Sequence, residues 1–260
     1  MMWDVMSASA RGARHERIGE PNEDAHRTGR FGDRAIVAIA DGHGSPSCPR
    51  ADRGSQFAVD AIFEVLEGDL EQLSPSLGER LVESWRRRVD RDLEADPLVG
   101  KSDSSDPNYL LYGTTAVGVA ADADNITVLQ IGDGDVLLGA KGSSTARRPI
   151  PPRAMDRPGA TESLCQNDAA SRVLTSSIDA SESSTDVVLI ATDGLDTAFA
   201  EEAWHDETMT DLMGRLVDAE SPEAIADLLQ GWCESPAAVG GDDTTIGLLV
   251  RSRLWSGGEE

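Results

Sequence analysis

Short runs of consecutive apolar residues, many of them β-branched, recur along the chain and predict buried β-strands. The predicted strands span residues 4–11, 34–40, 113–121, 126–132, 135–140, 187–191 and 244–250. Between them, apolar residues at every third or fourth position predict amphipathic helices. The predicted helices span residues 53–66, 77–93, 204–219 and 222–233. Because the helices come in pairs between groups of strands, the order predicts the layers of an α+β fold.

Two longer segments show neither the apolar runs of buried strands nor the spacing of amphipathic helices. Residues 95–112 are polar and turn-rich, and residues 142–184 are rich in Pro, Arg, Ser and Asp. No linker, repeat or low-complexity block divides the chain. Since 260 residues suit one folding unit, we expect a single domain over residues 1–260.

The charge balance is strongly acidic. The formal net charge is -24, with 47 Asp and Glu against 23 Lys and Arg. Such a surface repels nucleic acid and anionic membranes, so neither is an expected partner. Lysine occurs only at Lys101 and Lys141. An acidic, lysine-poor surface suits a cytoplasm of molar salt, where the Debye length is about 3 Å, and it predicts a halophilic source. The alternative is an ordinary acidic protein.

The chain carries no pattern typical of membrane or secreted proteins. No apolar run approaches the ~18 residues of a membrane span, and the N-terminus lacks a basic region followed by a hydrophobic one. Three scattered cysteines, Cys48, Cys165 and Cys233, lack the pairing of a disulfide framework or zinc site. We therefore expect a cytoplasmic protein with reduced cysteines.

Five short motifs rich in carboxylates follow the predicted strands or lie in the segments between them. They are Asn22-Glu23-Asp24, Asp41-Gly42-His43-Gly44, Gly132-Asp133-Gly134, Thr192-Asp193-Gly194 and Gly240-Gly241-Asp242-Asp243-Thr244. A carboxylate just beyond a buried strand is held by a rigid scaffold, and a following glycine lets the backbone approach a ligand closely. Oxygen ligands suit Mg²⁺ or Mn²⁺. Zinc prefers cysteine and clustered histidines, and neither occurs among these carboxylates.

In this order and at these separations, the motifs resemble those of the PP2C (PPM) metal-dependent protein phosphatases. The pattern Gly12-Ala13-Arg14-His15, followed by Gly19-Glu20-Pro21-Asn22-Glu23-Asp24-Ala25, resembles a bacterial and archaeal branch of that family. The resemblance covers roughly residues 7–250. It implies a four-layer α-β-β-α sandwich with two central antiparallel sheets. It also implies a variable flap beside the active site within residues 142–184, for which a surface loop is the alternative.

The same resemblance implies an activity. The expected reaction is hydrolysis of phosphoserine and phosphothreonine in proteins, by direct attack of a hydroxide that bridges two Mn²⁺ or Mg²⁺ ions, with a third ion in some members. The expected partners are phosphorylated proteins and a cognate serine/threonine kinase.

The resemblance also assigns ligands to the two ions. Asp41 is expected to bridge them, with the Gly42 carbonyl and Glu23 completing the protein ligands of one ion. Asp193 and Asp243 are expected to bind the other. Each of these residues taken alone is equally typical of a solvated turn, so the prediction rests on the ordered set.

Two further carboxylates receive supporting roles. Asp24 is expected to orient metal-bound water, and Asp133 to bind a third, weaker ion together with Asp193. The neighbouring Asp135 and Asp242 are left out of the expected site.

One histidine matches the general acid of the family. His43 is expected to donate a proton to the departing serine or threonine oxygen, because an alkoxide is a poor leaving group. The alternative is a histidine that only packs against the turn.

The chain departs from the family pattern at two positions. Gly19 occupies the place of an arginine that grips phosphate four residues before the metal-binding glutamate. His15 is the first candidate to replace it, ahead of Arg14 and Arg17. Thr244 stands where many members have an asparagine after the final aspartate, a change that leaves the carboxylate available.

Two other functions compete with the enzyme. A catalytically weak relative could bind phosphoproteins as a regulatory module, but such relatives commonly lose a metal ligand, and the expected ligands are present here. An acidic calcium-binding protein is the third hypothesis. The chain has no Asp-x-Asp-x-Asp-Gly loop with a distal glutamate, which that hypothesis needs.

Overall fold

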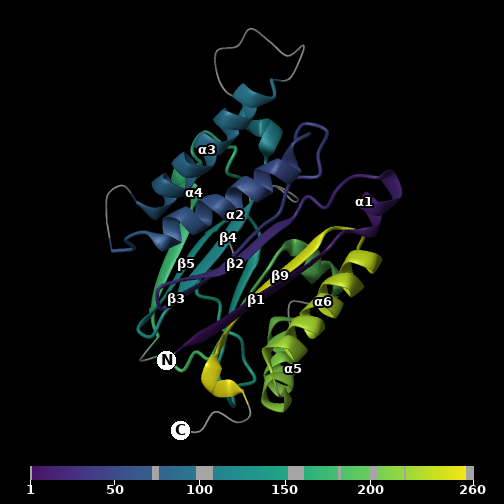
Figure 1. Cartoon of the computed structure of the whole chain (residues 1–260). Coiled ribbons are helices and arrows are strands. Elements are labelled where there is room, and N and C mark those ends of the chain that lie inside the picture. The colour runs from purple at the N-terminus through teal and green to yellow at the C-terminus, as the bar shows by residue number, and fades with distance from the viewer. Residues whose placement is uncertain are drawn as a thin grey trace.

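Two antiparallel sheets form the centre of the molecule (Figure 1). The computed structural model describes residues 2–71, 76–97, 108–151, 161–180, 183–199, 204–219 and 221–255. The four-stranded sheet contains, in spatial order, β1 (Trp3–Ala10), β9 (Thr244–Arg251), β8 (Val187–Ala191) and β6 (Asp135–Gly139). The five-stranded sheet contains β2 (Ala25–Phe31), β3 (Arg34–Ala40), β4 (Ala116–Ala121), β5 (Asn125–Ile131) and β7 (Leu174–Asp179). Every pair of neighbouring strands is antiparallel.

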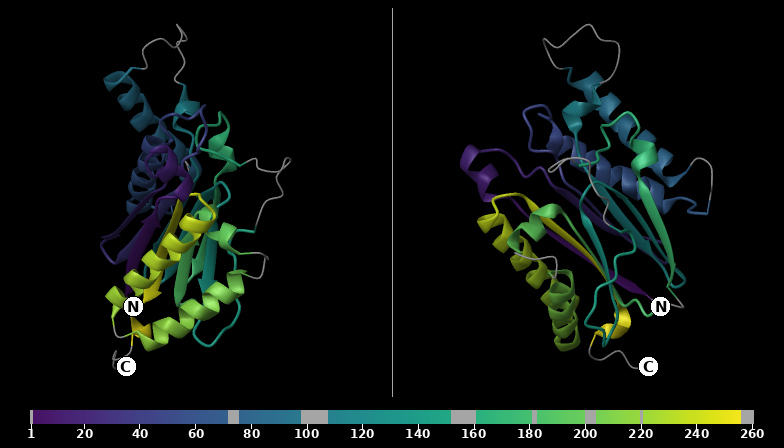
Figure 2. Two further views of the ribbon diagram at one scale, coloured as in Figure 1. Left: turned by 90° about the vertical axis from the view of Figure 1, so that its right-hand side faces the viewer. Right: turned by 180° about the vertical axis from the view of Figure 1, so that it is seen from behind.

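Pairs of long helices cover the outer faces of the sheets (Figures 1 and 2). α2 (Ala51–Glu67) and α3 (Leu77–Ala95) pack on the five-stranded sheet. α5 (Trp204–Asp218) and α6 (Pro222–Val239) pack on the four-stranded sheet. The short helices are α1 (Ala13–Ile18), α4 (Ala169–Arg172), η1 (Tyr109–Tyr112), η2 (Asp193–Ala198) and η3 (Ser252–Leu254). The expected four-layer α-β-β-α sandwich is confirmed.

Alternation along the central strands explains the layers. In β3, Ile36 and Ala38 face the helices α2 and α3, whereas Val37 and Ile39 face the other sheet. β8 divides its side chains in the same way between its helices and the facing sheet. Successive side chains of a strand point to opposite faces, so a strand that is buried on both faces must be apolar throughout. This is why these strands read as continuous apolar runs.

Local signals fix where two helices begin. The Ser76 hydroxyl accepts a hydrogen bond from the backbone nitrogen of Glu79, and the Glu79 carboxylate accepts one from the nitrogen of Ser76. This reciprocal pair satisfies two amides that α3 itself cannot pair. α6 begins with Pro222 directly after Ser221, as the sequence predicted.

The structure contains elements that the periodicity did not predict. α1 and β2 lie in the polar segment between the first two predicted strands, and α4 and β7 lie within residues 142–184. β2 is mostly exposed, and β7 alternates between half-buried and exposed side chains, so neither carries an apolar run. α6 continues past the predicted end at residue 233 and includes Pro236. Residues 152–160 and 181–182 of the expected flap lie outside the described residues.

Among the described residues, none forms a helix with the length and apolar character that crossing a bilayer requires.

Candidate active site

Three aspartates that follow three strand ends form one carboxylate cluster. Asp41 follows β3, Asp133 follows β5 and Asp193 follows β8. Each offers an oxygen atom, and these oxygens all lie within 4.8 Å of one another. Since β3 and β5 belong to one sheet and β8 to the other, the facing sheets meet at this cluster. The structure therefore brings together three of the expected metal ligands.

The cluster is electrostatically unfavourable when its carboxyl groups are all ionised. Burial raises the pKa of Asp41 well above its ordinary value, and the charges of Asp24 and Asp193 raise it further. Burial, followed by the charge of Asp133, raises the pKa of Asp193 to about 6. Like charges this close disfavour each other's ionisation, and a divalent cation would reverse that effect. The donors are carboxylate oxygens, which fit Mg²⁺ or Mn²⁺.

Asp24 lies near Asp41 and Asp193 and is held by a threonine. The Thr192 hydroxyl donates a hydrogen bond of 2.9 Å to Asp24, and Thr192 itself accepts one from the Thr245 backbone nitrogen. Burial raises the pKa of Asp24 to about 8, and hydrogen bonds from Thr245 and Thr192 oppose the rise. Because Thr192 directly precedes Asp193, this contact joins Asp24 to the loop of a predicted ligand.

Glu23 approaches the turn after β3 from the N-terminal segment. The Gly42 nitrogen donates a 3.2 Å hydrogen bond to the Glu23 carbonyl. A Cβ atom on Gly42 would lie 2.7 Å from that oxygen and 2.9 Å from the Ala51 carbonyl oxygen, so the contact requires glycine. Burial raises the pKa of Glu23 to about 7, against an opposing effect of His15. Its Oε2 is buried and has no hydrogen-bond partner among the described residues, which leaves it available to a ligand.

His43 lies at the edge of the carboxylate cluster. Its backbone nitrogen donates to the Gly113 carbonyl at 3.0 Å, which fixes the turn. Burial lowers the pKa of the imidazole, and the nearby charge of Asp133 opposes this shift. The side chain is therefore next to the cluster, where the general-acid assignment needs it.

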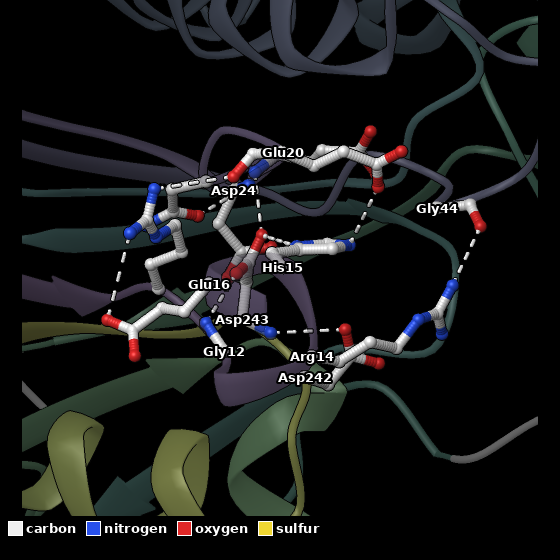
Figure 3. Close-up of polar contacts among 12 residues, drawn as sticks. Gly12, Arg14, His15, Glu16, Glu20, Asp24, Gly44, Asp242 and Asp243 are labelled. Carbon is white, nitrogen blue, oxygen red and sulfur yellow. Dashed lines mark hydrogen bonds and ion pairs between the residues drawn. The ribbon is translucent and has the colours of Figure 1, made fainter. Parts of the chain in front are cut away.

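Asp243, an expected ligand, lies outside the cluster. One of its oxygens, Oδ1, accepts a 2.6 Å hydrogen bond from the Gly12 nitrogen. The other, Oδ2, accepts from the Glu23 nitrogen at 2.6 Å and lies 2.9 Å from Nδ1 of His15 (Figure 3). The carboxylate is buried, and three protein donors surround it.

Asp242, which was left out of the expected site, is exposed and near the cluster instead. Its charge raises the pKa values of both Asp41 and Asp193. One of its oxygens accepts a 3.1 Å hydrogen bond from the Asp243 nitrogen (Figure 3). In the sequence, only the presence of two consecutive aspartates marks this position. It does not indicate which of the two lies near the cluster.

The candidates for phosphate binding lie on and beside α1. The His15 side chain is only 2% exposed. Arg14 is exposed, and its guanidinium donates a 3.2 Å hydrogen bond to the carbonyl of Gly44, the residue after His43. No ion pair of Arg14 occurs among the described residues. Of the two side chains, only that of Arg14 is open to solvent at the loop that carries His43.

The structure also explains why the family arginine is missing at Gly19. Gly19 ends α1 in the left-handed conformation, with φ of 73°. A residue with a side chain is strained there, so this turn favours glycine. The short helix that Gly19 terminates is the element that places Arg14 at the site.

A pH dependence follows from the raised pKa values. Burial raises the pKa values of Glu23, Asp24 and Asp193 to about 7, 8 and 6 in the folded chain, from 4.5, 3.8 and 3.8. Between these limits the metal-free folded protein binds more protons than the unfolded chain, so its free energy of unfolding falls as pH rises. We expect the melting temperature in EDTA to fall from about pH 4 to pH 8, by about 2–4 °C for each kcal/mol lost.

Thermal unfolding over this pH range with EDTA, and again with Mn²⁺, tests the expectation. Protons and metal ions compete for the same oxygens, so stabilisation by Mn²⁺ should grow with pH. A metal-free melting temperature that rises over the same window would contradict the assigned pKa shifts.

Comparison with known proteins identifies a family that matches most of the chain. The sequence model of a family described as protein phosphatase 2C matches residues 11–230. No curated protein matches the chain.

Solved structures share the fold at low sequence identity. PppA from Pseudomonas aeruginosa is 16% identical with a TM-score of 0.64, over 96% of this chain and 98% of that one. The serine/threonine phosphatase Stp1 from Staphylococcus aureus is 16% identical with a TM-score of 0.64, over 96% and 95%. The catalytic domain of the phosphatase PstP, in complex with two manganese ions, is 17% identical with a TM-score of 0.57, over 95% and 97%.

Proposed function

The chain belongs to the protein phosphatase 2C family, and from this premise we propose that it hydrolyses phosphoserine and phosphothreonine in proteins. The carboxylate cluster of Asp41, Asp133 and Asp193 carries the proposal. These three carboxyl groups, with Glu23, Asp24 and Asp242 nearby, make a site that is repulsive when empty and suited to divalent cations. A protein that only bound phosphate would gain nothing from such a concentration of negative charge.

The proposed cofactor is a pair of Mn²⁺ or Mg²⁺ ions, as manganese in the PstP structure. When bound, two such ions would lower the pKa of a water molecule and stabilise negative charge on the phosphoryl oxygens. We assign Asp41 to both ions and Asp193 to one of them. For the remaining carboxylate of that ion we propose Asp242 in place of Asp243, because the Asp243 oxygens already accept three protein hydrogen bonds.

The other residues of the cluster support this arrangement. Glu23, with its unpaired carboxylate oxygen, and the Gly42 carbonyl are proposed to serve the second ion. Asp24 is proposed to orient bound water through its fixed contact with Thr192. Asp133 is the most exposed member of the cluster and is proposed to bind a third, weaker ion.

Arg14 is the proposed phosphate-binding cation. Its guanidinium has five donors in a planar fork, of which one contacts the Gly44 carbonyl. Bidentate recognition of phosphate oxygens is the usual use of free guanidinium donors. His15 was the first candidate from the sequence, but its ring is enclosed and engaged with Asp243.

His43 is proposed to give a proton to the leaving oxygen. Burial alone lowers the pKa of its imidazole, which would leave it neutral near pH 7. A bound phosphate dianion raises the pKa of a neighbouring imidazole, so the protonated form would be favoured when substrate is present. The protonated imidazole of His43 would then lie beside the leaving oxygen of the substrate.

We further propose phosphorylated proteins as substrates, a cognate serine/threonine kinase, and a cytoplasm of high salt as the setting. The net charge of -24 supports the last point, since molar salt screens surface repulsion. A phosphoprotein-binding regulatory module is the alternative function. The intact carboxylate set speaks for the enzyme, because a binding module has no use for it.

Metal dependence is the first test. We expect hydrolysis of phosphoserine peptides and of an aryl phosphate to require added Mn²⁺ or Mg²⁺ and to stop in EDTA. No cysteine or serine with an adjacent base lies in the cluster of described carboxylates, so a side-chain nucleophile is not expected. Release of inorganic phosphate, measured with and without metal, decides the matter. Full activity in EDTA or a trapped phosphoenzyme would overturn the mechanism, and metal binding without phosphatase activity would favour the regulatory module.

A further inference from the structure

We propose that Asp243 and His15 form a buried positioning pair that holds Glu23 at the metal site and contacts neither metal nor phosphate itself. The functional consequence rests on the proposed phosphatase function, since it concerns the placement of a proposed metal ligand. The pair lies between the start of β9 and the N-terminal segment that contains α1 (Figure 3).

The Asp243 carboxylate joins three points of the N-terminal segment. Its oxygens accept hydrogen bonds from the backbone nitrogens of Gly12 and Glu23, both at 2.6 Å. The third contact, at 2.9 Å, is with Nδ1 of His15. A buried charge is costly unless donors surround it, and here three donors do. Three of the roughly four acceptor positions of the carboxylate are therefore used to hold the N-terminal segment.

The N-terminal segment packs closely against the turn that contains Gly241 and Asp242. A Cβ atom on Gly12 would lie 2.4 Å from the carbonyl carbon of Asp242, so only glycine fits there. The Arg14 nitrogen also donates to the Gly241 carbonyl at 3.0 Å. The N-terminal segment thus lies directly against the turn that precedes β9.

The hydrogen on the His15 ring can be assigned from its partner. A carboxylate only accepts hydrogen bonds, so Nδ1 carries the hydrogen and donates it to Asp243. The other ring nitrogen, Nε2, has no hydrogen-bond partner among the residues described and lies 3.9 Å from Oε2 of Glu20. Positioning therefore acts through Nδ1. Direct contact with metal or phosphate would have to act through Nε2.

Two amide substitutions separate the two nitrogens. The side-chain amide of asparagine occupies the place of Nδ1, and that of glutamine the place of Nε2. We expect His15→Asn to keep the donor to Asp243 and to bind Mn²⁺ about as tightly as the wild type. His15→Gln should weaken Mn²⁺ binding by about 10–100-fold, the usual effect of losing a residue that orients a ligand. Isothermal titration of Mn²⁺ measures both.

The opposite order would overturn the proposal. If His15→Gln bound Mn²⁺ like the wild type and His15→Asn did not, Nε2 would be the working atom and His15 a direct ligand. If both variants bound Mn²⁺ normally but raised KM for phosphopeptides, His15 would contact phosphate. The first of these results does not depend on whether the protein is a phosphatase, because it is read from metal affinity alone.

A second measurement needs no metal. Hydrogen exchange of the Glu23 amide, which donates to Asp243, should remain slow in His15→Asn and become fast in His15→Gln. Equal protection in the two variants would overturn the positioning role even if the wild type bound no metal.

The adjacent aspartates provide the matched control. Asp242→Asn should reduce the number of Mn²⁺ ions bound, because Asp242 is a proposed ligand. Asp243→Asn should leave the number of bound Mn²⁺ ions unchanged but lower the Mn²⁺ affinity and the melting temperature. The asparagine NH₂ group would face one of the three hydrogen-bond donors that now contact the carboxylate. Loss of an ion in Asp243→Asn, with full binding in Asp242→Asn, would return Asp243 to the metal site and refute the pair.

Discussion

Asp41→Asn is expected to abolish Mn²⁺ binding at the paired site and hydrolysis of every phosphate ester. Asp41 lies in the carboxylate cluster and is the proposed bridge between two cations, so the substitution removes a charge from both. The loss should exceed the 10–100-fold typical of residues that only support a ligand. Phosphate release from a phosphopeptide and from an aryl phosphate, with Mn²⁺ titration of the same sample, measures it.

The stability of this variant distinguishes a lost ligand from a damaged fold. Burial and neighbouring carboxylates raise the pKa of Asp41, so its ionised form is unfavourable in the metal-free protein. Asparagine relieves that repulsion, and the metal-free melting temperature at pH 7–8 should stay level or rise. Added Mn²⁺ should no longer raise it. A variant that still gained stability from Mn²⁺ as the wild type does would refute the bridging role.

His43→Ala is expected to separate two kinds of substrate. The departing serine or threonine oxygen needs a proton, and removing a general acid costs on the order of 10²–10⁴ in rate. A nitrophenyl phosphate has a leaving group that departs unaided, so its hydrolysis should fall much less. Mn²⁺ affinity should be nearly unchanged, because the imidazole lies beside the cluster and is no proposed ligand.

The comparison of the two substrates is the decisive measurement for His43. Parallel rates for a phosphoserine peptide and a nitrophenyl phosphate should give a ratio that changes on substitution. Equal losses on both, with unchanged Mn²⁺ affinity, would show that His43 only packs against the turn at Gly113.

The sequence by itself determined the buried strands, the long helices and the order of the carboxylate motifs. β3 is apolar at each position after Arg34 because one face meets helices and the other a sheet, and such a pattern is local. The prediction of a divalent cation with oxygen ligands also came from the sequence, since it depends on the type of donor groups. β2 and β7 escaped prediction because much of their surface is exposed, and their stability comes from pairing with β3 and β5.

Only the tertiary structure decided which side chains face the cluster. Asp242 and Asp243 are identical in type and adjacent, yet one is exposed beside Asp41 and Asp193 while the other is buried under three donors. The sequence likewise ranked His15 ahead of Arg14 as the phosphate-binding candidate. The structure reverses this order because His15 is buried against Asp243, whereas Arg14 is exposed and contacts the Gly44 carbonyl. Burial and hydrogen-bond partners come from distant segments, and no local pattern contains them.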